Sequence, residues 1–441
     1  MNQRRGIPVL LALLMLLVSA RPSVAQVQHD SQLAAALDDM YDACLFGADG
    51  PFGQAFSLAT QSLAPGLSGF IESNLASIPL TPPSLEVVSE NNELVEVVTG
   101  FTPIFTESSG TVGKGNFFVG SNFSYFNLTK IRGQDLSDLQ FAFQQDGGGD
   151  IIVVNMPLDI NAAVFTLYGT YGITNRLDVG FALPIVNLSM ERQATTFEVV
   201  GEHTGCRYGA GCTPGQSGGS PLVNYFFAGG VAIDVGADDA IEATPDLETI
   251  PESETYLNTL ALRAKYRFPT TLASGKLAAV VDMRLPVGRN EGNVLGQGHF
   301  GTRVTLIAEY DEFENFKPFV NLGAQFWNGD DSNSLRFATG FTQRVASKLF
   351  FAFDLLGKID IEDPPFLAPF DEPSGEATGV EISLAGSTIP ALSRDHTLNA
   401  GLGLQAVFSP SFFVYGSALF SLLDRGLQSA VAPTIGAALY F

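Results

Sequence analysis

Four histidines are the residues of this chain that could act as general bases: His29, His203, His299 and His396. A hydrolase would need one of them beside a serine nucleophile, with a third polar group to orient the imidazole. His299 lies just before an alternating stretch in GQGHFG, and His396 opens another in RDHTLN. We expect both to be solvated side chains at strand ends. The sequence therefore predicts no enzyme activity and no cofactor.

The two cysteines of CRYGAGC, Cys206 and Cys212, lie in a long glycine-rich stretch. Exposure to an oxidising compartment would favour a local disulfide between them, because the small residues between them allow a tight turn. Zinc prefers four ligands, and only His203 is close in sequence, so we expect no metal site. Cys44 lies in an apolar stretch and is expected to be a small buried hydrophobe.

Charged side chains recur at every second position in the second half of the chain. Arg263, Lys265 and Arg267 alternate with apolar residues, and residues 276–285 repeat the pattern. Burying unpaired ions costs on the order of several kcal/mol each. An aqueous lumen removes that cost, and lipid accepts the apolar face, although a soluble sandwich would show the same alternation. The residues predicted to face a lumen are Arg263, Lys265, Arg267, Asp282, Arg284, Arg303, Glu309, Lys317, Arg336 and Arg344, joined by Asp178, Asp354 and Lys358.

These inward positions hold more bases than acids, whereas acids gather in the segments between the strands. Such a lumen would attract anionic or polarised solutes. The alternative is cross-strand ion pairing that fills the interior of a narrow barrel. The acidic runs at 234–254, 330–331 and 362–363 could bind divalent cations near lipopolysaccharide. They lack the spacing of a calcium loop, so we expect solvated loops instead.

The N-terminus predicts export. Arg4 and Arg5 precede a short apolar run, and Ser23-Val24-Ala25 supplies the small residues of a cleavage site. This is the pattern of a signal peptide over residues 1–25. Cleavage of residues 1–25 would remove three arginines and no acid, so the net charge of the remaining chain would be −26 instead of −23.

The lengths of the alternating segments and of their connections favour a membrane barrel over a soluble sandwich. From about residue 116 the segments run about 10 to 14 residues, close to a tilted membrane-spanning strand. Short connections are predicted at 172–175, 270–275, 311–315, 346–348 and 409–411, and longer ones at 191–255, 288–299, 328–333, 361–395 and 424–429. Short turns at one end and long loops at the other are typical of outer-membrane barrels. We count about twelve strands, an even number that closes the barrel.

The last strand carries a further signal. Val431, Ile435, Ala437, Leu439 and Phe441 share one face, and the chain ends on the aromatic residue. Leu439 and Phe441 resemble the signal that barrel-assembly machinery reads at the C-terminus of outer-membrane proteins.

Composition excludes several other classes. Acids outnumber bases by 46 to 23, which argues against nucleic acid binding. A hydrophobic content of 46% excludes intrinsic disorder, and three cysteines cannot form a disulfide scaffold in 441 residues. Residues 26–100 carry Ala and Leu at helical spacing and then a proline-rich connector. We expect a helical periplasmic segment or plug here, with one more short element at residues 86–98.

Three stretches carry a family resemblance. They are GKGNFFVG at 113–120, YGITNRLDVGFALP at 171–184, and MRLP at 283–286 with GQG at 296–298. They resemble the outer-membrane family named for the meta-pathway of phenol degradation, whose members are described as transporters or channels. The likeness covers about residues 100–441 and implies passage of small, including aromatic, organic molecules. It does not include residues 26–100 or the 191–255 insertion.

The sequence thus predicts an all-β transmembrane antiparallel barrel over residues 101–441, with a long outer loop at 191–255. It would lie in the outer membrane of a Gram-negative-type bacterium, among lipid and lipopolysaccharide. The predicted function is a channel or transporter for small solutes, including hydrophobic or aromatic organics. The alternatives are a structural or adhesive surface barrel with a filled lumen and, third, a lipid-modifying barrel enzyme.

Overall fold

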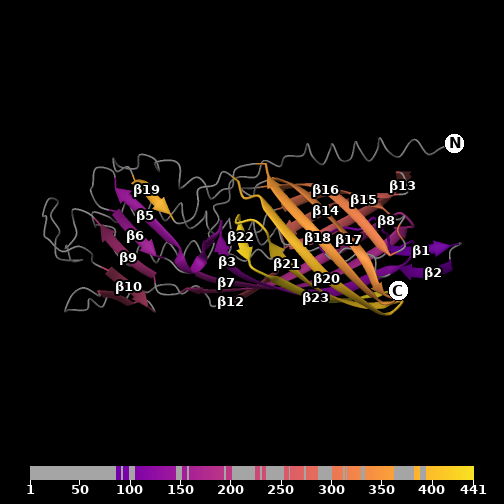
Figure 1. Ribbon diagram of the computed structural model, residues 1–441, viewed down its shortest axis with the longest axis horizontal. Helices are drawn as coiled ribbons and strands as arrows, with labels where there is room; N and C mark the ends of the chain where they lie inside the picture. The colour runs from indigo at the N-terminus through magenta and orange to yellow at the C-terminus, as the bar shows by residue number, and fades with distance from the viewer. Residues whose placement is uncertain are drawn as a thin grey trace.

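The fold is a closed antiparallel barrel of twelve strands, seen in a computed structural model (Figure 1). The structure describes residues 86–90, 93–98, 105–145, 151–155, 158–192, 195–200, 224–228, 231–234, 253–257, 259–272, 275–286, 300–310, 313, 315–328, 333–361, 382–387 and 394–441. The barrel strands are β3 (Phe117–Ile131), β7 (Leu158–Thr174), β8 (Leu177–Arg192), β13 (Thr259–Leu272), β14 (Gly275–Pro286), β15 (Phe300–Tyr310), β16 (Phe316–Asn328), β17 (Ser334–Ala346), β18 (Leu349–Asp360), β20 (Thr397–Ser409), β21 (Phe412–Ser421) and β23 (Ala432–Tyr440).

Each strand pairs with the next in this order, and β23 closes the barrel against β3. The closing register runs from Thr434 opposite Ser124 to Tyr440 opposite Phe118. It continues into reciprocal backbone hydrogen bonds of 2.8 and 3.0 Å between Phe441 and Phe117. The barrel therefore has no open edge, as a sheet surrounded by lipid requires.

Along each strand polar and apolar side chains alternate, but the polar ones point inward and the apolar ones outward, the reverse of a soluble protein. On β16 the polar Asn321 and Gln325 are buried at 4% and 2% exposure, whereas Val320 and Leu322 are exposed at 44% and 59%. On β23 the exposed side chains include Ile435 and Leu439. An apolar outer surface with polar residues inside is the arrangement of a membrane barrel.

The connections differ between the two ends of the barrel, which we call the turn end and the loop end. At the turn end β7 and β8 are joined through residues 175–176, and β20 and β21 through 410–411. The predicted turn at 270–275 is shorter than expected, because β13 continues to Leu272 and β14 begins at Gly275. The predicted twelve strands and the alternation of short and long connections are confirmed.

The loop end carries more structure than the sequence predicted. The β3–β7 connection, which we did not single out, contains β4 (Gln134–Asp135), η1 (Leu136–Asp138), β5 (Gln140–Gln145) and β6 (Ile151–Asn155). The other loop-end strands are β9 (Thr195–Val200), β10 (Asn224–Ala228), β11 (Val231–Asp234), β12 (Ser253–Leu257), β19 (Ile382–Ser387) and β22 (Leu427–Ser429). Strands from three different loops pair into one six-stranded sheet in the order β11-β10-β9-β6-β5-β19, beyond the barrel in Figure 1.

The short element predicted at residues 86–98 is a β-hairpin of β1 (Glu86–Glu90) and β2 (Glu93–Val98). The predicted signal peptide and the helices expected between residues 26 and 85 lie outside the described residues. Among the residues that the structure describes, no helix has the length and apolar character to cross a membrane.

The outward face yields a first prediction. Leu322 lies midway along β16, whereas Val345 is outward-facing next to the turn at the end of β17. We expect Leu322→Arg to destabilise the barrel by about 2–4 kcal/mol, because it places a charge near the middle of the lipid. Val345→Arg should cost about 0–1 kcal/mol, since it lies near the interface.

Urea-induced unfolding in lipid vesicles, followed by the heat-modifiable mobility of the folded barrel, measures both variants. Equal losses for the two variants would contradict a membrane belt at this position.

Candidate functional site

A stretch of chain before the first barrel strand lies inside the barrel. Every residue from 105 to 112 is buried, and we call this stretch the lumen segment. Its hydrogen-bonding partners come from the inward faces of β8, β13, β15, β16, β18 and β23. A segment that contacts strands on opposite sides of the barrel must cross its lumen. The segment is therefore the first candidate for a functional element.

Glu309 of β15 binds the centre of the lumen segment. Its Oε2 accepts hydrogen bonds from the Ser109 backbone N–H at 2.9 Å, from Ser108 Oγ at 3.1 Å, and from Ser109 Oγ. Lys317 of β16 lies with its Nζ 3.5 Å from Oε1 of the same carboxylate. Hydrogen bonds to a charged group are stronger than neutral ones, so this carboxylate is a main anchor of the segment.

Glu107 of the segment brings a negative charge to the bases of β13. Its carboxylate lies 2.8 Å from Arg263 Nη2 and 3.7 Å from Lys265 Nζ. Lys265 Nζ also donates to the backbone carbonyls of Ser108 at 3.1 Å and Gly110 at 3.2 Å. The segment thus neutralises part of the positive charge of the lumen, and the lumen satisfies the segment's backbone.

Both ends of the segment are held by buried carboxylates of the barrel. Asp354 of β18 accepts from the Phe105 N–H at 3.3 Å and from Thr106 Oγ1 at 3.1 Å. At the other end Asp178 accepts from the Val112 N–H at 2.9 Å. The Asp178 contact lies near the turn end, because Asp178 is the second residue of β8, whereas Asp354 lies midway along β18.

Two glycines let the chain leave the lumen and enter β3. Gly113 and Gly115 have φ angles of +80° and +82°, which L-residues with a side chain rarely adopt. The Gly115 N–H donates to the Gly172 carbonyl at 2.8 Å, and the Gly172 N–H donates to the Asn116 carbonyl at 3.0 Å. A Cβ at Gly172 would lie 1.8 Å from the Gly113 carbonyl oxygen, so only glycine fits at this contact.

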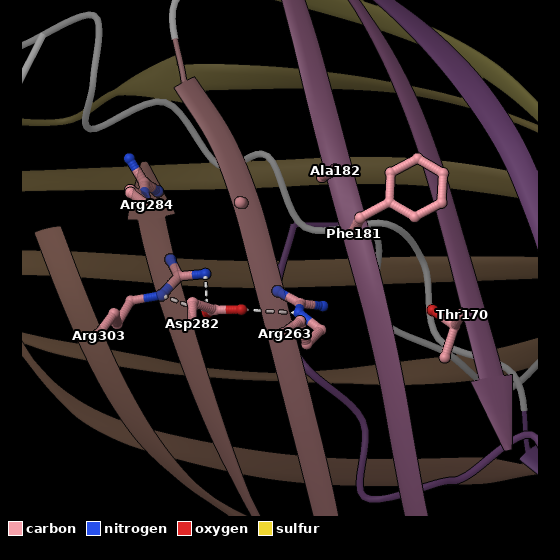
Figure 2. A pocket seen from close by; sticks show the side chains of 8 residues that line it. Thr170, Phe181, Ala182, Arg263, Asp282, Arg284 and Arg303 are labelled. Atoms are coloured by element: carbon pink, nitrogen blue, oxygen red, sulfur yellow. Dashed lines mark hydrogen bonds and ion pairs between the residues drawn. The ribbon is translucent and has the colours of Figure 1, made fainter. Parts of the chain in front are cut away.

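A charged layer lies next to the segment on the loop-end side. Asp282 of β14 accepts from Arg263 Nε at 2.8 Å through one oxygen, and from Arg303 Nε and Nη2 at 2.9 and 2.7 Å through the other (Figure 2). Arg284, one inward position further toward the loop end, is 2% exposed, and its guanidinium lies 5.6 Å from the ring centroid of Trp327. Two guanidinium groups therefore bind one carboxylate, and a third lies one inward position further toward the loop end.

The other side of the lumen is aromatic. Phe118 stacks on Phe413 with ring centroids 5.9 Å apart, and the Tyr168 and Tyr415 hydroxyls are 3.4 Å apart. The buried cluster to which they belong comprises Phe105, Val112, Phe118, Tyr168, Ala182, Ala261, Ala352, Phe413, Tyr415, Ala438 and Tyr440. The lumen is thus charged along β13–β16 and aromatic along β3, β7, β21 and β23.

Most of the residues predicted to face the lumen are brought together here. Lys265, Asp282, Arg284, Arg303, Glu309 and Lys317 are buried, as are Asp178, Asp354 and Lys358. Arg336 and Arg344 are half-buried, and Arg344 lies over the Phe350 ring. Arg267 lies at the turn end, where Nη2 donates to the Asn175 carbonyl at 3.0 Å. Contact between these residues and a solute stays a prediction.

The lumen segment falls within the predicted barrel domain and could not be recognised from the sequence. Residues 105–112 show neither period two nor helical spacing, and Ser, Thr and Gly dominate them. A short polar stretch of this kind is typical of a loop. Only the glycines at 113 and 115, before the first strand, signalled a special backbone conformation.

The loop end is locked by a buried ion pair. Arg132 at the end of β3 makes two 2.8 Å hydrogen bonds to Asp395, and the Gly426 N–H donates to the same carboxylate at 3.3 Å. His396 lies beside this pair and accepts from the Asp360 N–H at 3.3 Å through Nδ1.

Leu439 and Phe441, the predicted assembly signal, are exposed on the outer face at 40% and 65%.

Several other predictions concern residues that the structure does not describe, including Cys206, Cys212, His203 and His299. The stretch GQSGG at 215–219, whose letters match the nucleophile motif G-x-S-x-G, was not among the predictions and also lies outside the described residues. That motif acts at a strand-to-helix turn. Across the described ranges, no three His, Cys, Asp or Glu residues group as a metal site.

Comparisons with known proteins give structural likeness without sequence likeness. No protein-family model and no curated protein matches the chain. Among solved structures, an outer membrane channel from Pseudomonas putida F1 aligns with 13% identity over 76% of this chain and 99% of that one, at a TM-score of 0.45. The KdgM porin aligns with 7% identity over 69% and 98%, and a mutant of the TodX monoaromatic hydrocarbon channel with 11% over 74% and 90%, both at a TM-score of 0.31.

The contact at Gly172 yields a second prediction. We expect Gly172→Ala to displace residues 113–115 and loosen the lumen segment, because the new Cβ meets backbone rather than a flexible side chain. Hydrogen exchange of the amides of residues 105–115 should then speed up by about tenfold or more, the result of losing at least about 1.4 kcal/mol of protection.

Gly416→Ala is the matched control, because its Cβ would meet only the Thr434 carbonyl oxygen at 3.9 Å. If both variants exchange like the parent chain, the lumen segment does not depend on the Gly172 contact.

Proposed function

We propose that this protein is an outer-membrane channel for small solutes, and that the lumen segment closes the channel at its turn end. The supporting observation is the set of contacts between residues 105–112 and the barrel. Every polar contact described above is a hydrogen bond or an ion pair to a barrel side chain or backbone group. Such contacts can be exchanged for water, and of the segment's residues only Phe105 and Val112 belong to the apolar cluster. We infer that the segment can leave its place in the lumen without unfolding the barrel. The proposed location follows from the apolar belt, with the short turns on the periplasmic side.

The proposed solutes are small organic molecules, including hydrophobic or aromatic ones. Phe118, Phe413 and Tyr415 are buried while the lumen segment is in place, and their rings would be available to an aromatic solute once it moves. The charged side carries more bases than acids and would favour anionic or polarised molecules. The family resemblance of the GKGNFFVG and YGITNRLDVGFALP stretches supports the same class of solute.

The burial of the segment also favours a second candidate, a structural or adhesive surface barrel whose lumen stays filled. In that case the ion pairs of Glu107 and Glu309 would be permanent core contacts. The two functions differ in one property. Weakening the contacts of the lumen segment would open a channel, whereas it would only destabilise a filled barrel. Among the described residues a lipid-modifying enzyme has less support, because His396, the one histidine in these ranges, accepts its Nδ1 hydrogen bond from a backbone N–H at the loop end.

The contacts of Glu309 with the lumen segment yield a third prediction. Glu309→Gln removes the charge that anchors Ser108 and Ser109 and pairs with Lys317. Losing charge-assisted hydrogen bonds should weaken the binding of the lumen segment to the barrel by about 1.5–3 kcal/mol. The open fraction of single channels in a planar bilayer should then rise by about 10- to 100-fold.

Asp135→Asn serves as the control, because it removes one acid from an exposed ion pair with Lys130 at the loop end. A Glu309→Gln protein that folds and stays electrically silent would favour the filled barrel over the channel.

A further inference from the structure

A short stretch of the β3–β7 connection folds over the loop end of the barrel. It comprises residues 131–139, with β4 and η1, and we call it the outer lid. We propose that the outer lid closes the loop-end mouth of the lumen, that the Arg132–Asp395 ion pair latches it, and that it opens independently of the lumen segment. This inference rests on the proposed channel function and adds a second closure to it.

The lid begins where the chain turns back at the end of β3. β4 pairs with the last residues of β3, so the chain reverses within a few residues. Arg132 and Gly133 form the turn, with φ angles of +50° and +83°. The Arg132 N–H donates to the Gly426 carbonyl at 2.8 Å, and a Cβ at Gly133 would lie 3.0 Å from the Asp424 Cβ. The turn therefore packs against the β21–β23 connection.

The apolar side chains of the lid are buried, although they lie at the end of the barrel. Ile131, Leu136 and Leu139 are 0%, 1% and 1% exposed, and η1 contacts both β3 and β7. Leu128 on β3 and Ile160 on β7 pair with each other just below the lid, and their inward side chains are buried as well. Inward residues at the rim of an open lumen would contact water. Their burial indicates that the mouth is covered here, next to the apolar groups of the lid.

The mouth is also covered on the opposite side of the barrel. Gln325, Ser334 and Asp360 lie near the loop ends of β16, β17 and β18 and are 2%, 2% and 1% exposed. Ser334 pairs with both of the others, so the three form one row across the strands. Polar side chains at the rim of an open mouth would be solvated. The cover therefore extends across the mouth.

Two contacts join the β3–β7 connection to the β18–β20 connection. β5 begins at Gln140, directly after the lid, and pairs with β19 of the β18–β20 connection. Arg132 makes its bidentate ion pair with Asp395 of the same connection. In the sheet, β3 and β20 are separated by β21 and β23. The two connections are therefore tied together over the strands that lie between them, as a strap across part of the mouth would be.

The ion pair has the properties of a latch. The Arg132 and Asp395 side chains are 0% and 3% exposed, so the loss of one charge leaves the other buried and unpaired. A bidentate pair also fixes the orientation of both side chains.

The lid and the lumen segment lie at different levels of the lumen. The segment is bound by Asp178, Glu309 and Asp354, which lie between the middle of the barrel and its turn end. The contacts of the lid lie at the loop end. Two closures at opposite ends can open separately.

Hydrogen exchange of the full chain, followed by mass spectrometry, tests the lid. Asp395→Asn keeps the shape of the side chain and removes the charge that holds Arg132. We expect the amides of residues 131–139 to exchange faster by about tenfold or more, because opening the lid then costs less free energy. The amides of residues 105–112 should exchange as in the parent chain, because the lumen segment keeps its contacts.

Asp135→Asn is the matched control, because it removes an acid of the same lid from an exposed ion pair with Lys130. It should exchange like the parent chain. Unchanged exchange of residues 131–139 in the Asp395→Asn protein would overturn the latch. Equal acceleration of residues 105–112 would mean that the ion pair only stabilises the barrel as a whole, and would overturn the separate lid.

Two further variants keep the test decisive where Asp395→Asn fails to fold. Arg132→Gln breaks the same ion pair and leaves Asp395 the hydrogen bond from the Gly426 N–H. Leu136→Ala removes apolar contact from the lid without changing its charge. Both should accelerate exchange in the lid alone, and a folded variant of either kind with an unchanged lid would overturn the inference.

Conductance in planar bilayers separates this inference from the proposed function. Two closures in series give an open fraction that is the product of the two, so Asp395→Asn should raise the open fraction of the Glu309→Gln channel by about tenfold or more again. Conductance that Asp395→Asn leaves unchanged would keep the channel and overturn the lid as its closure. Faster exchange in the lid without conductance in any variant would keep the latched lid and reject the channel.

Discussion

Closure of the sheet is the constraint on which the rest of this structure depends. Backbone groups that face lipid have no water to bind, so each must pair with a neighbouring strand. The pairing of β23 with β3 meets this requirement and fixes the barrel at twelve strands. A barrel of this size has a narrow interior, and inward side chains from neighbouring strands come within ion-pairing distance. The contacts of Asp282 with Arg263 and Arg303 follow directly from this geometry.

The same constraint explains why the lumen segment is polar and well bonded. A chain that crosses a narrow lumen loses water from its backbone, and the barrel must replace those hydrogen bonds. Carboxylates of Asp354, Glu309 and Asp178 accept the segment's N–H and O–H groups, and Lys265 donates to its carbonyls. The charges of the lumen are thus arranged around the segment as much as around the strands. In the proposed channel, most of the contacts that hold the segment in the lumen are ones that water can replace.

The sequence predicted the barrel better than the site. Period-two alternation is imposed by lipid on every strand, so the strand number and the inward positions of Arg263, Asp282 and Arg303 could be derived from residue order alone. The lumen segment could not, because Ser108, Ser109 and Gly110 carry no period and derive their role from partners about 200 residues away. The partners of each charge depend on register and strand tilt. The six-stranded loop sheet was missed because its strands, of four to six residues, come from three loops and are too short for the pattern to stand out.

The central claim is that residues 105–112 close the lumen, and the most direct test is to remove them. Single-channel conductance would be measured for the chain from residue 26 and for a variant that begins at Lys114. A variant that begins near residue 98 keeps the segment but lacks the region predicted as a plug at 26–100, so it serves as the control. Our account predicts rare or small openings for the full chain and larger, sustained ones for the shortened chain. Equal conductance, or silence from a shortened chain that has folded, would contradict it.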